Sequence, residues 1–159
     1  MPRPPTEPTA VATAVFEVPA EDVWSYRLDF SNLPEYNPDV SGVERVAAGA
    51  GVGDHCGPGA RYTFLLEDRR RPGEPQPVEL WMEDAIEPSL VSAGMRGGNE
   101  AYEEFEVRAT DDGCEATLTL WVTMPAGLPD RVLEAAAAAS FDQINKELIL
   151  MKSVLEGRS

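Results

Sequence analysis

The chain has 159 residues, the size of one ordinary domain and enough to enclose a hydrophobic core. Hydrophobic residues make up 43% and charged residues 26%, a composition typical of globular rather than disordered proteins. The 28 acidic and 13 basic residues give a formal net charge of −15, which disfavours binding to nucleic acids and to anionic membranes. The sequence contains no run of about 18 apolar residues that could span a membrane.

The chain begins with a proline-rich segment that has neither the charged start nor the apolar stretch of a signal peptide. We expect residues 1–8 to be a disordered tail, and residues 9–159 to form one domain located in the cytoplasm. Cys56 and Cys114 lie far apart and fit no metal signature. Free thiols are therefore expected, a disulfide between them stays open, and no metal or other cofactor is predicted.

The first elements are predicted from residue types and from one proline. Residues 9–18 mix Ala, Val, Thr and Phe, a pattern typical of a strand. Pro19 suits the first turn of a helix, and the carboxylates that follow it favour a helix over residues 20–29. A second short helix is expected over residues 31–36.

A different pattern occupies residues 40–124. Apolar and polar side chains alternate in segments that are separated by Gly, Pro and Asp. Such segments are typical of strands, and their short connections indicate an antiparallel meander. The expected strands cover residues 40–47, 60–70, 76–87, 90–96, 100–109 and 114–124.

Alternation also predicts which side chains share the apolar face of each strand, provided that no bulge interrupts the strand. In the segment 76–87 it places Met82 and Ile86 on the apolar face, opposite three glutamates. The same rule turns Glu103 inward together with Phe105.

The last long segment, residues 128–156, carries apolar residues at intervals of three and four, which predicts an amphipathic helix. Its apolar stripe is formed by Leu133, Ala137, Phe141, Ile144, Leu148, Met151 and Leu155. We therefore predict an α+β fold, a curved antiparallel sheet of about seven strands around a long C-terminal helix, with two short helices after the first strand. Space between sheet and helix would form an apolar cavity for a small molecule.

Several segments together resemble a known superfamily. The matching segments are residues 15–24 (VFEVPAEDVW), 28–29, 33–38 (LPEYNP), 51–53 and 112–117, followed by the terminal helix. In their order and spacing the chain resembles the START-like or SRPBCC superfamily, the helix-grip fold of birch-pollen-type allergens, lipid-transfer domains and polyketide cyclase/dehydrases. The resemblance covers residues 9–156. It implies a strand–helix–helix–six-strand–helix topology and an internal hydrophobic cavity, but no single activity.

Glu103 is the most informative candidate, because a carboxylate that faces an apolar cavity should have a raised pKa and could act as an acid, a base or a ligand partner. Glu103 would have no such role if it lay near the end of the sheet and reached water, or if a bulge turned its side chain outward. Tyr36 and Tyr62 could supply hydroxyls to a ligand or could be core aromatics. The predicted ligand-contacting residues are Tyr36, Tyr62, Phe64, Leu80, Met82, Ala93, Met95, Glu103, Phe105, Leu118, Phe141 and Ile144.

Other conspicuous residues receive structural interpretations. Trp24 is expected to anchor the first helix on the sheet. His55, the one histidine, has too few partners for a zinc site. Aromatase/cyclase members of the superfamily pair a pocket arginine with tryptophans, whereas Arg61 and Arg69 are expected to point outward here.

Three classes of function are compatible with the sequence. The first is binding of a small hydrophobic molecule, such as a lipid, a polyketide or an isoprenoid. The second is a polyketide cyclase/dehydratase in which Glu103 or a tyrosine moves a proton. The third is a protein-interaction module. Whether the chain is an enzyme, and whether it is a monomer or a homodimer, stays open.

Overall fold

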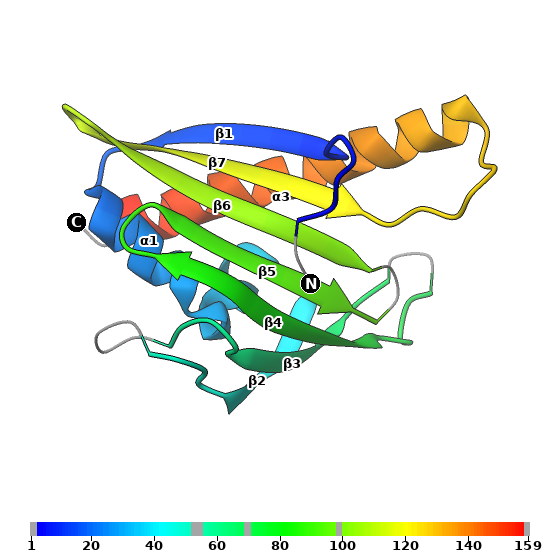
Figure 1. The fold of residues 1–159 in the computed structure, drawn as a ribbon, viewed down its shortest axis with the longest axis horizontal. Helices are drawn as coiled ribbons and strands as arrows, with labels where there is room; N and C mark the ends of the chain where they lie inside the picture. Colours follow the sequence, from blue (N-terminus) through cyan, green and yellow to red (C-terminus); the bar gives the residue numbers. More distant parts are fainter. Residues whose placement is uncertain (1–2, 52–55, 69–70, 98–99, 158–159) are drawn as a thin grey trace.

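The predicted fold class is confirmed by a computed structural model that describes residues 3–51, 56–68, 71–97 and 100–157 (Figure 1). A curved antiparallel sheet of seven strands packs against a long C-terminal helix, and short helices follow the first strand. The elements are β1 (Ala10–Phe16), α1 (Ala20–Leu28), the 3-10 helix η1 (Phe30–Asn32), α2 (Leu33–Tyr36), β2 (Val40–Ala47), β3 (Arg61–Leu66), β4 (Gln76–Ile86), β5 (Leu90–Arg96), β6 (Ala101–Thr110), β7 (Gly113–Val122) and α3 (Asp130–Gly157).

The sheet has the strand order β1-β7-β6-β5-β4-β3-β2. Strands β2 to β7 form a meander, and the last strand, β7, pairs with the first strand, β1. The two edges of the sheet are therefore β1 and β2. β6 and β7 pair without a register shift from Ala101↔Val122 to Thr110↔Gly113. This regular pairing fixes which side chains of β6 face α3. Among the described residues, no helix has the length and apolar composition that a membrane-spanning helix needs.

One predicted orientation in β4 is wrong. Met82 is buried as expected, but the side chain of Ile86 is 55% exposed. The register between β4 and β5 shifts between Met82 and Asp84, and the backbone N–H of Asp84 donates a 3.0 Å hydrogen bond to Ser92 Oγ. The extra residue reverses the faces of the rest of the strand, so Ala85 packs on the core instead.

Helix α1 is held on the inner side of the sheet by Trp24, which confirms its predicted anchoring role. The indole is fully buried, and its Nε1–H donates a 2.9 Å hydrogen bond to the carbonyl of Leu90 on β5. A buried indole needs such a partner for its single donor. The same helix face carries Arg27 into the interior, since it lies one turn further along the helix.

The outer face of β6 and β7, which points away from α3, is covered by the start of the chain. Residues 3–8 contain no helix or strand. Trp121 Nε1–H donates a 3.0 Å hydrogen bond to the carbonyl of Thr6, and the Arg3 guanidinium lies 5.3 Å from the centre of the same indole. Arg3 Nε also donates to Glu104 Oε1 at 2.6 Å. Trp121 is therefore buried although it faces away from the core.

Helix α3 has two halves with different environments. Figure 1 shows it crossing the sheet behind β1 and β7, with its first turns extending past the end of β7. The buried side chains of α3 all lie in its second half. In the first half, Leu133 and Phe141 lie on the predicted apolar stripe but are 39% and 43% exposed.

Candidate functional site

Most of the predicted ligand-contacting residues form the closely packed interior between the sheet and the helices. Ten of the twelve are buried, Met95 is half-buried and Phe141 is exposed. The ten are Tyr36, Tyr62, Phe64, Leu80, Met82, Ala93, Glu103, Phe105, Leu118 and Ile144. Side chains of Leu80, Phe105 and Leu118 have 1% exposed surface or less, so neighbouring atoms fill the space next to them. A depression of about 510 Å³ along β2, β3, β4 and the end of β5 is lined by only one of the twelve predicted residues, Phe64.

The interior contains a buried ion-pair cluster centred on Arg27 of α1. The Arg27 side chain is 1% exposed, and its Nη2 donates to Glu103 Oε1 of β6 at 2.7 Å. Its Nη1 donates to Glu147 Oε1 of α3 at 3.3 Å. Asn37, just after α2, donates from Nδ2 to the other oxygen of Glu147 at 3.4 Å. We call Arg27, Glu103, Glu147, Tyr36 and Asn37 the Arg27 cluster.

The predicted inward orientation of Glu103 is confirmed. Its Cα pairs regularly with Ala93 on one side and Leu120 on the other, and the residue is 7% exposed. No bulge turns it away from the interior. The carboxylate therefore lies among apolar side chains with a guanidinium as its direct partner.

Arg27 is enclosed by aromatic rings as well as by carboxylates. Its guanidinium carbon lies 5.0 Å from the ring centre of Tyr36, 5.3 Å from that of Phe105 and 5.6 Å from that of Phe30. Such placements are attractive because the ring faces are electron-rich. Burial alone lowers the pKa of Arg27, but the negative charges of Glu103 and Glu147 raise it above its ordinary value. The guanidinium therefore stays charged.

Glu147 is the titratable member of the cluster. Burial raises its pKa from 4.5 to about 7, and the negative charge of Glu103 adds to this effect. The Coulomb attraction of Arg27 and hydrogen bonds from Arg27 and Gln143 oppose the rise. Glu147 can therefore gain and lose a proton near neutral pH, in contact with a permanent cation.

Two buried polar atoms of the cluster make no hydrogen bond within the described part of the chain. These atoms are Tyr36 Oη and Arg27 Nε. A buried polar group without a partner costs about 1–3 kcal/mol. Burial also raises the pKa of Tyr36, so its hydroxyl remains protonated and can both donate and accept. The cluster thus keeps unused hydrogen-bonding capacity in the interior.

Tyr62 belongs to a separate group of side chains. Its hydroxyl lies 3.2 Å from Cys56 Sγ and donates to Asp29 Oδ1 at 3.5 Å, while its ring meets that of Phe30 edge-on. Burial raises the pKa of Tyr62. These contacts fit the core-aromatic interpretation of Tyr62. Cys56 and Cys114 are both buried free thiols, as predicted. His55 and Arg69 lie outside the described residues, and Arg61 points outward to an ion pair with Glu79, as predicted.

Toward one end of the sheet, the inward-facing side chains become partly exposed. Met95, Ala101 and Val122 are direct cross-strand neighbours on β5, β6 and β7, and all three are only half-buried. The next inward position on β6 is Glu103, which is buried. The interior therefore opens one step beyond the Arg27 cluster.

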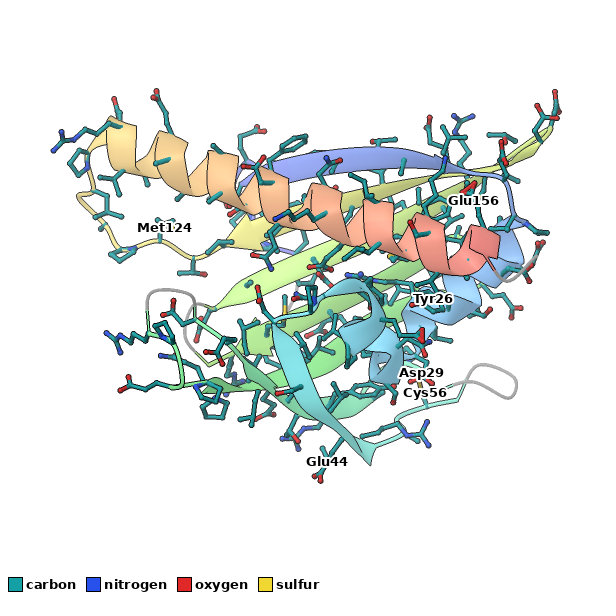
Figure 2. All side chains as sticks on the ribbon, turned by 180° about the vertical axis from the view of Figure 1, so that it is seen from behind. Tyr26, Asp29, Glu44, Cys56, Met124 and Glu156 are labelled. Carbon is teal, nitrogen blue, oxygen red and sulfur yellow. The ribbon has the colours of Figure 1, made fainter. Side chains whose placement is uncertain are left out.

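The exposed first half of α3 begins at the same end of the molecule. Figure 2 shows Met124 beneath the first turns of α3, and Tyr26, Asp29 and Cys56 at the opposite end. Leu133 and Phe141 lie on the α3 face that continues into the buried half of the helix. We call this region the open end; its residues are Met95, Ala101, Val122, Leu133 and Phe141.

Arg27 and Glu147 were not among the predicted site residues. Arg27 lies three residues after Trp24, a spacing that puts both side chains on one helix face. Glu147 lies three residues after Ile144 and four before Met151, on the apolar stripe of α3. A charged residue at such a position is a signal for a buried polar site, because burying an unpaired charge is costly.

Comparisons with known proteins agree with the fold and the resemblance. Similar solved structures include a START superfamily protein from Mycobacterium smegmatis, with a TM-score of 0.68, 15% identity and coverage of 94% of this chain and 97% of that chain. The protein TTHA0849 from Thermus thermophilus has a TM-score of 0.63 and 17% identity, with coverage of 94% of this chain and 99% of that chain. At these identities the likeness shows the fold alone.

A third similar structure is the di-domain ARO/CYC StfQ from the steffimycin biosynthetic pathway, with a TM-score of 0.72 and 13% identity. The match covers 93% of this chain but 50% of StfQ. Among curated proteins, no sequence matches the chain. Residues 7–156 match the model of one protein family, which is nearly the whole chain. The chain therefore belongs to the polyketide cyclase/dehydrase and lipid transport family, within the predicted START-like superfamily.

Proposed function

We propose that this chain binds a small hydrophobic molecule, such as a lipid, a polyketide or an isoprenoid, between the sheet and α3. The apolar body of the ligand lies at the open end, and its polar end reaches the Arg27 cluster. One observation carries the proposal: along β6, the inward side chains change from half-buried Ala101 to the buried, charged Glu103. Apolar surface next to a few oriented polar groups is the usual composition of a small-molecule site.

The proposal is supported by the family, whose description includes lipid transport. Exposed apolar side chains on α3 supply the surface that a ligand would cover, and covering them is favourable by about 25 cal/mol per Å². The formal charge of −15 supports the absence of a nucleic-acid partner. A cytoplasmic location stays a prediction from the sequence.

A second candidate function is acid–base catalysis of the polyketide cyclase/dehydratase kind. The observation that favours it is Glu147, whose pKa of about 7 suits proton transfer at neutral pH, close to the unpartnered hydroxyl of Tyr36. Arg27 adds an interior cation that can stabilise a developing negative charge, although its Nη1 and Nη2 are already engaged by carboxylates and only Nε is without a partner in the described part of the chain.

Native and denaturing mass spectrometry of freshly purified protein tests the binding proposal. We expect a lipophilic adduct that is present in the native spectrum and lost on denaturation. Phe141→Asp should reduce its occupancy several-fold, because the charge lies at the open end. Ile149→Asp is the matched control, since Ile149 is also an exposed apolar residue of α3 but lies off the apolar stripe.

The outcomes separate the two functions. Equal occupancy in both variants would contradict the proposed position of the ligand. A protein that carries no adduct and takes up no added apolar probe would contradict ligand binding itself. If the chain is an enzyme, Glu147→Gln should abolish turnover while ligand binding persists, whereas a carrier shows no turnover to lose.

A further inference from the structure

The cation of the Arg27 cluster is not available to a ligand at the open end. Arg27 uses Nη2 for Glu103 and Nη1 for Glu147, and Nη1 also contacts Met151 Sδ at 3.8 Å. Aromatic rings pack around the guanidinium, and the residue is 1% exposed. Nε has no hydrogen-bond partner among the residues that the structure describes, but it is buried as well. An anionic ligand could reach Nη1 or Nη2 only by displacing a carboxylate from a buried ion pair, which is strongly unfavourable.

Glu103, in contrast, keeps acceptor capacity next to the open end, whereas both oxygens of Glu147 accept hydrogen bonds from Arg27 and Asn37. Among the described residues, the hydrogen bonds of Glu103 engage Oε1, and none engages Oε2. An ionised carboxylate offers about four acceptor positions. Glu103 is also the cluster member one inward step from half-buried Ala101. A ligand that enters from the open end therefore meets an acceptor before it meets the cation.

The net charge of the cluster also disfavours an anionic ligand. One guanidinium faces two carboxylates, so the three groups sum to one negative charge when both carboxylates are ionised. The negative net charge of the whole chain adds to this potential. In the low dielectric of the interior, a second anion beside Glu103 is repelled strongly.

We infer that the site accepts molecules whose polar end donates hydrogen bonds, such as an alcohol, a phenol or a protonated amine, and rejects molecules that end in a carboxylate or phosphate. This inference rests on the proposed function, and it narrows the ligand class. The hydroxyl or ammonium group donates to Glu103, and the unpartnered hydroxyl of Tyr36 is a further partner for a ligand oxygen. Free fatty acids are thereby excluded as ligands.

Three probes with the same ten-carbon chain test this inference: 1-decanol, decylamine and decanoate. Each is titrated against protein loaded with N-phenyl-1-naphthylamine, an uncharged fluorescent probe, at about pH 8, where Glu147 is mostly ionised. We expect 1-decanol and decylamine to displace the dye, and decanoate to bind at least about tenfold more weakly. Decanoate that binds as well as 1-decanol would overturn the inference.

A matched pair of variants tests whether Glu103 causes the weaker binding of decanoate. Glu103 and Glu104 are adjacent on β6, but Glu103 faces Arg27 in the interior while Glu104 faces Arg3 on the outer side. Glu103→Gln should improve decanoate binding relative to 1-decanol by about tenfold, because it frees part of the Arg27 charge. Glu104→Gln should leave the ranking unchanged, and an equal effect of both variants would contradict the role of Glu103.

The test keeps the inference and the proposed function apart. If the dye and all three probes fail to bind to folded wild-type protein, the proposed function is wrong. If they bind but decanoate is preferred, only the inference is wrong. If the Glu103→Gln variant does not fold, the relative affinities of the three probes for the wild-type protein still test the inference.

Discussion

Arg27, Glu103 and Glu147 bring one cation and two carboxylates together where almost no water reaches them. Removing each charge from water costs several kcal/mol, and the mutual attraction of the groups repays this only when the geometry is good. Replacing such a group by well-packed apolar residues is often neutral or stabilising. Stability alone therefore does not account for this cluster, whereas ligand recognition or proton transfer would.

Glu147→Gln should remove a pH-dependent part of the stability. The pKa of Glu147 is about 7 in the folded chain and 4.5 as its ordinary value, so the folded state holds the proton more tightly. This contribution to stability is complete below about pH 4.5 and is lost as the pH rises through about 7. When the pH is raised from 5 to 8, the free energy of unfolding in urea should fall by up to about 2–3 kcal/mol more for the wild type than for the variant.

Glu134→Gln is the control for this prediction, because Glu134 is an exposed carboxylate on the same helix. Its stability should follow the wild type at every pH. A Glu147→Gln variant that also follows the wild type would show that Glu147 titrates alike in the folded and unfolded chains.

At the scale of the element, α3 combines two functions in one helix. The helix packs on β1, α2 and β7, and its second half supplies Glu147 to the interior. The first half continues the same apolar face, but without a covering layer, so Leu133 and Phe141 stay exposed. The long helix therefore fixes one end of the proposed site by packing and presents apolar surface at the other end.

The same Leu→Ala substitution should destabilise the protein to different degrees in the two halves of α3. Leu148 has no exposed surface, so Leu148→Ala should lower the free energy of unfolding by about 2–5 kcal/mol through lost contacts and a cavity. Leu133 is 39% exposed, and Leu133→Ala should cost less than about 1 kcal/mol. Chemical denaturation of ligand-free protein measures both, and similar losses would mean that the first half of α3 packs against the sheet in solution.

The elements were predictable from sequence to different degrees. Period-two alternation predicts the inner face of β6, including Glu103, because the pairing of β6 is regular. The same rule fails for Ile86, since a single extra residue in β4 leaves no local mark in the sequence. Helical periodicity predicts the stripe of α3, but not that its first half lacks a partner.

The Arg27 cluster was predictable only in part. Glu103 could be found within its own strand, but the contacts that enclose Arg27 join residues that are far apart in the chain. Arg27 is separated by 76 residues from Glu103 and by 120 residues from Glu147. A charged side chain within a helix is ordinarily assigned to solvent, and only the tertiary contacts show that Arg27 is enclosed. The open end, too, depends on how far α3 extends beyond the sheet.

At the scale of the whole molecule, the two sides of the sheet have different coverings. The inner side packs on the helices, and the outer side of β6 and β7 is covered by residues 3–8 through Trp121. This outer contact lies across the sheet from the Arg27 cluster. The start of the chain should therefore affect the environment of Trp121 without changing the proposed ligand site.

Deleting residues 1–6 should shift the tryptophan emission to longer wavelength and increase quenching by acrylamide. The deletion removes both the Arg3 guanidinium and the Thr6 carbonyl from the Trp121 indole. In a Trp121→Phe background the same deletion should leave the emission unchanged, because Trp24 is enclosed by the core and the Trp81 indole contacts Glu83 and Arg96 of the sheet. Unchanged emission in the wild-type background would show that residues 3–6 do not cover Trp121.

The pairing of β1 with β7 also has a consequence for synthesis. β1 leaves the ribosome before every other strand of the sheet, yet its partners belong to the last strand, from Leu120 opposite Ala10 to Cys114 opposite Phe16. Until β7 emerges, the nascent chain has an unpaired apolar strand and a sheet that lacks one edge. Closing so long a loop is slow, and contacts that are distant in sequence delay folding. We therefore expect the native fold to form only after β7 has left the ribosome, with the nascent chain depending on chaperones until then.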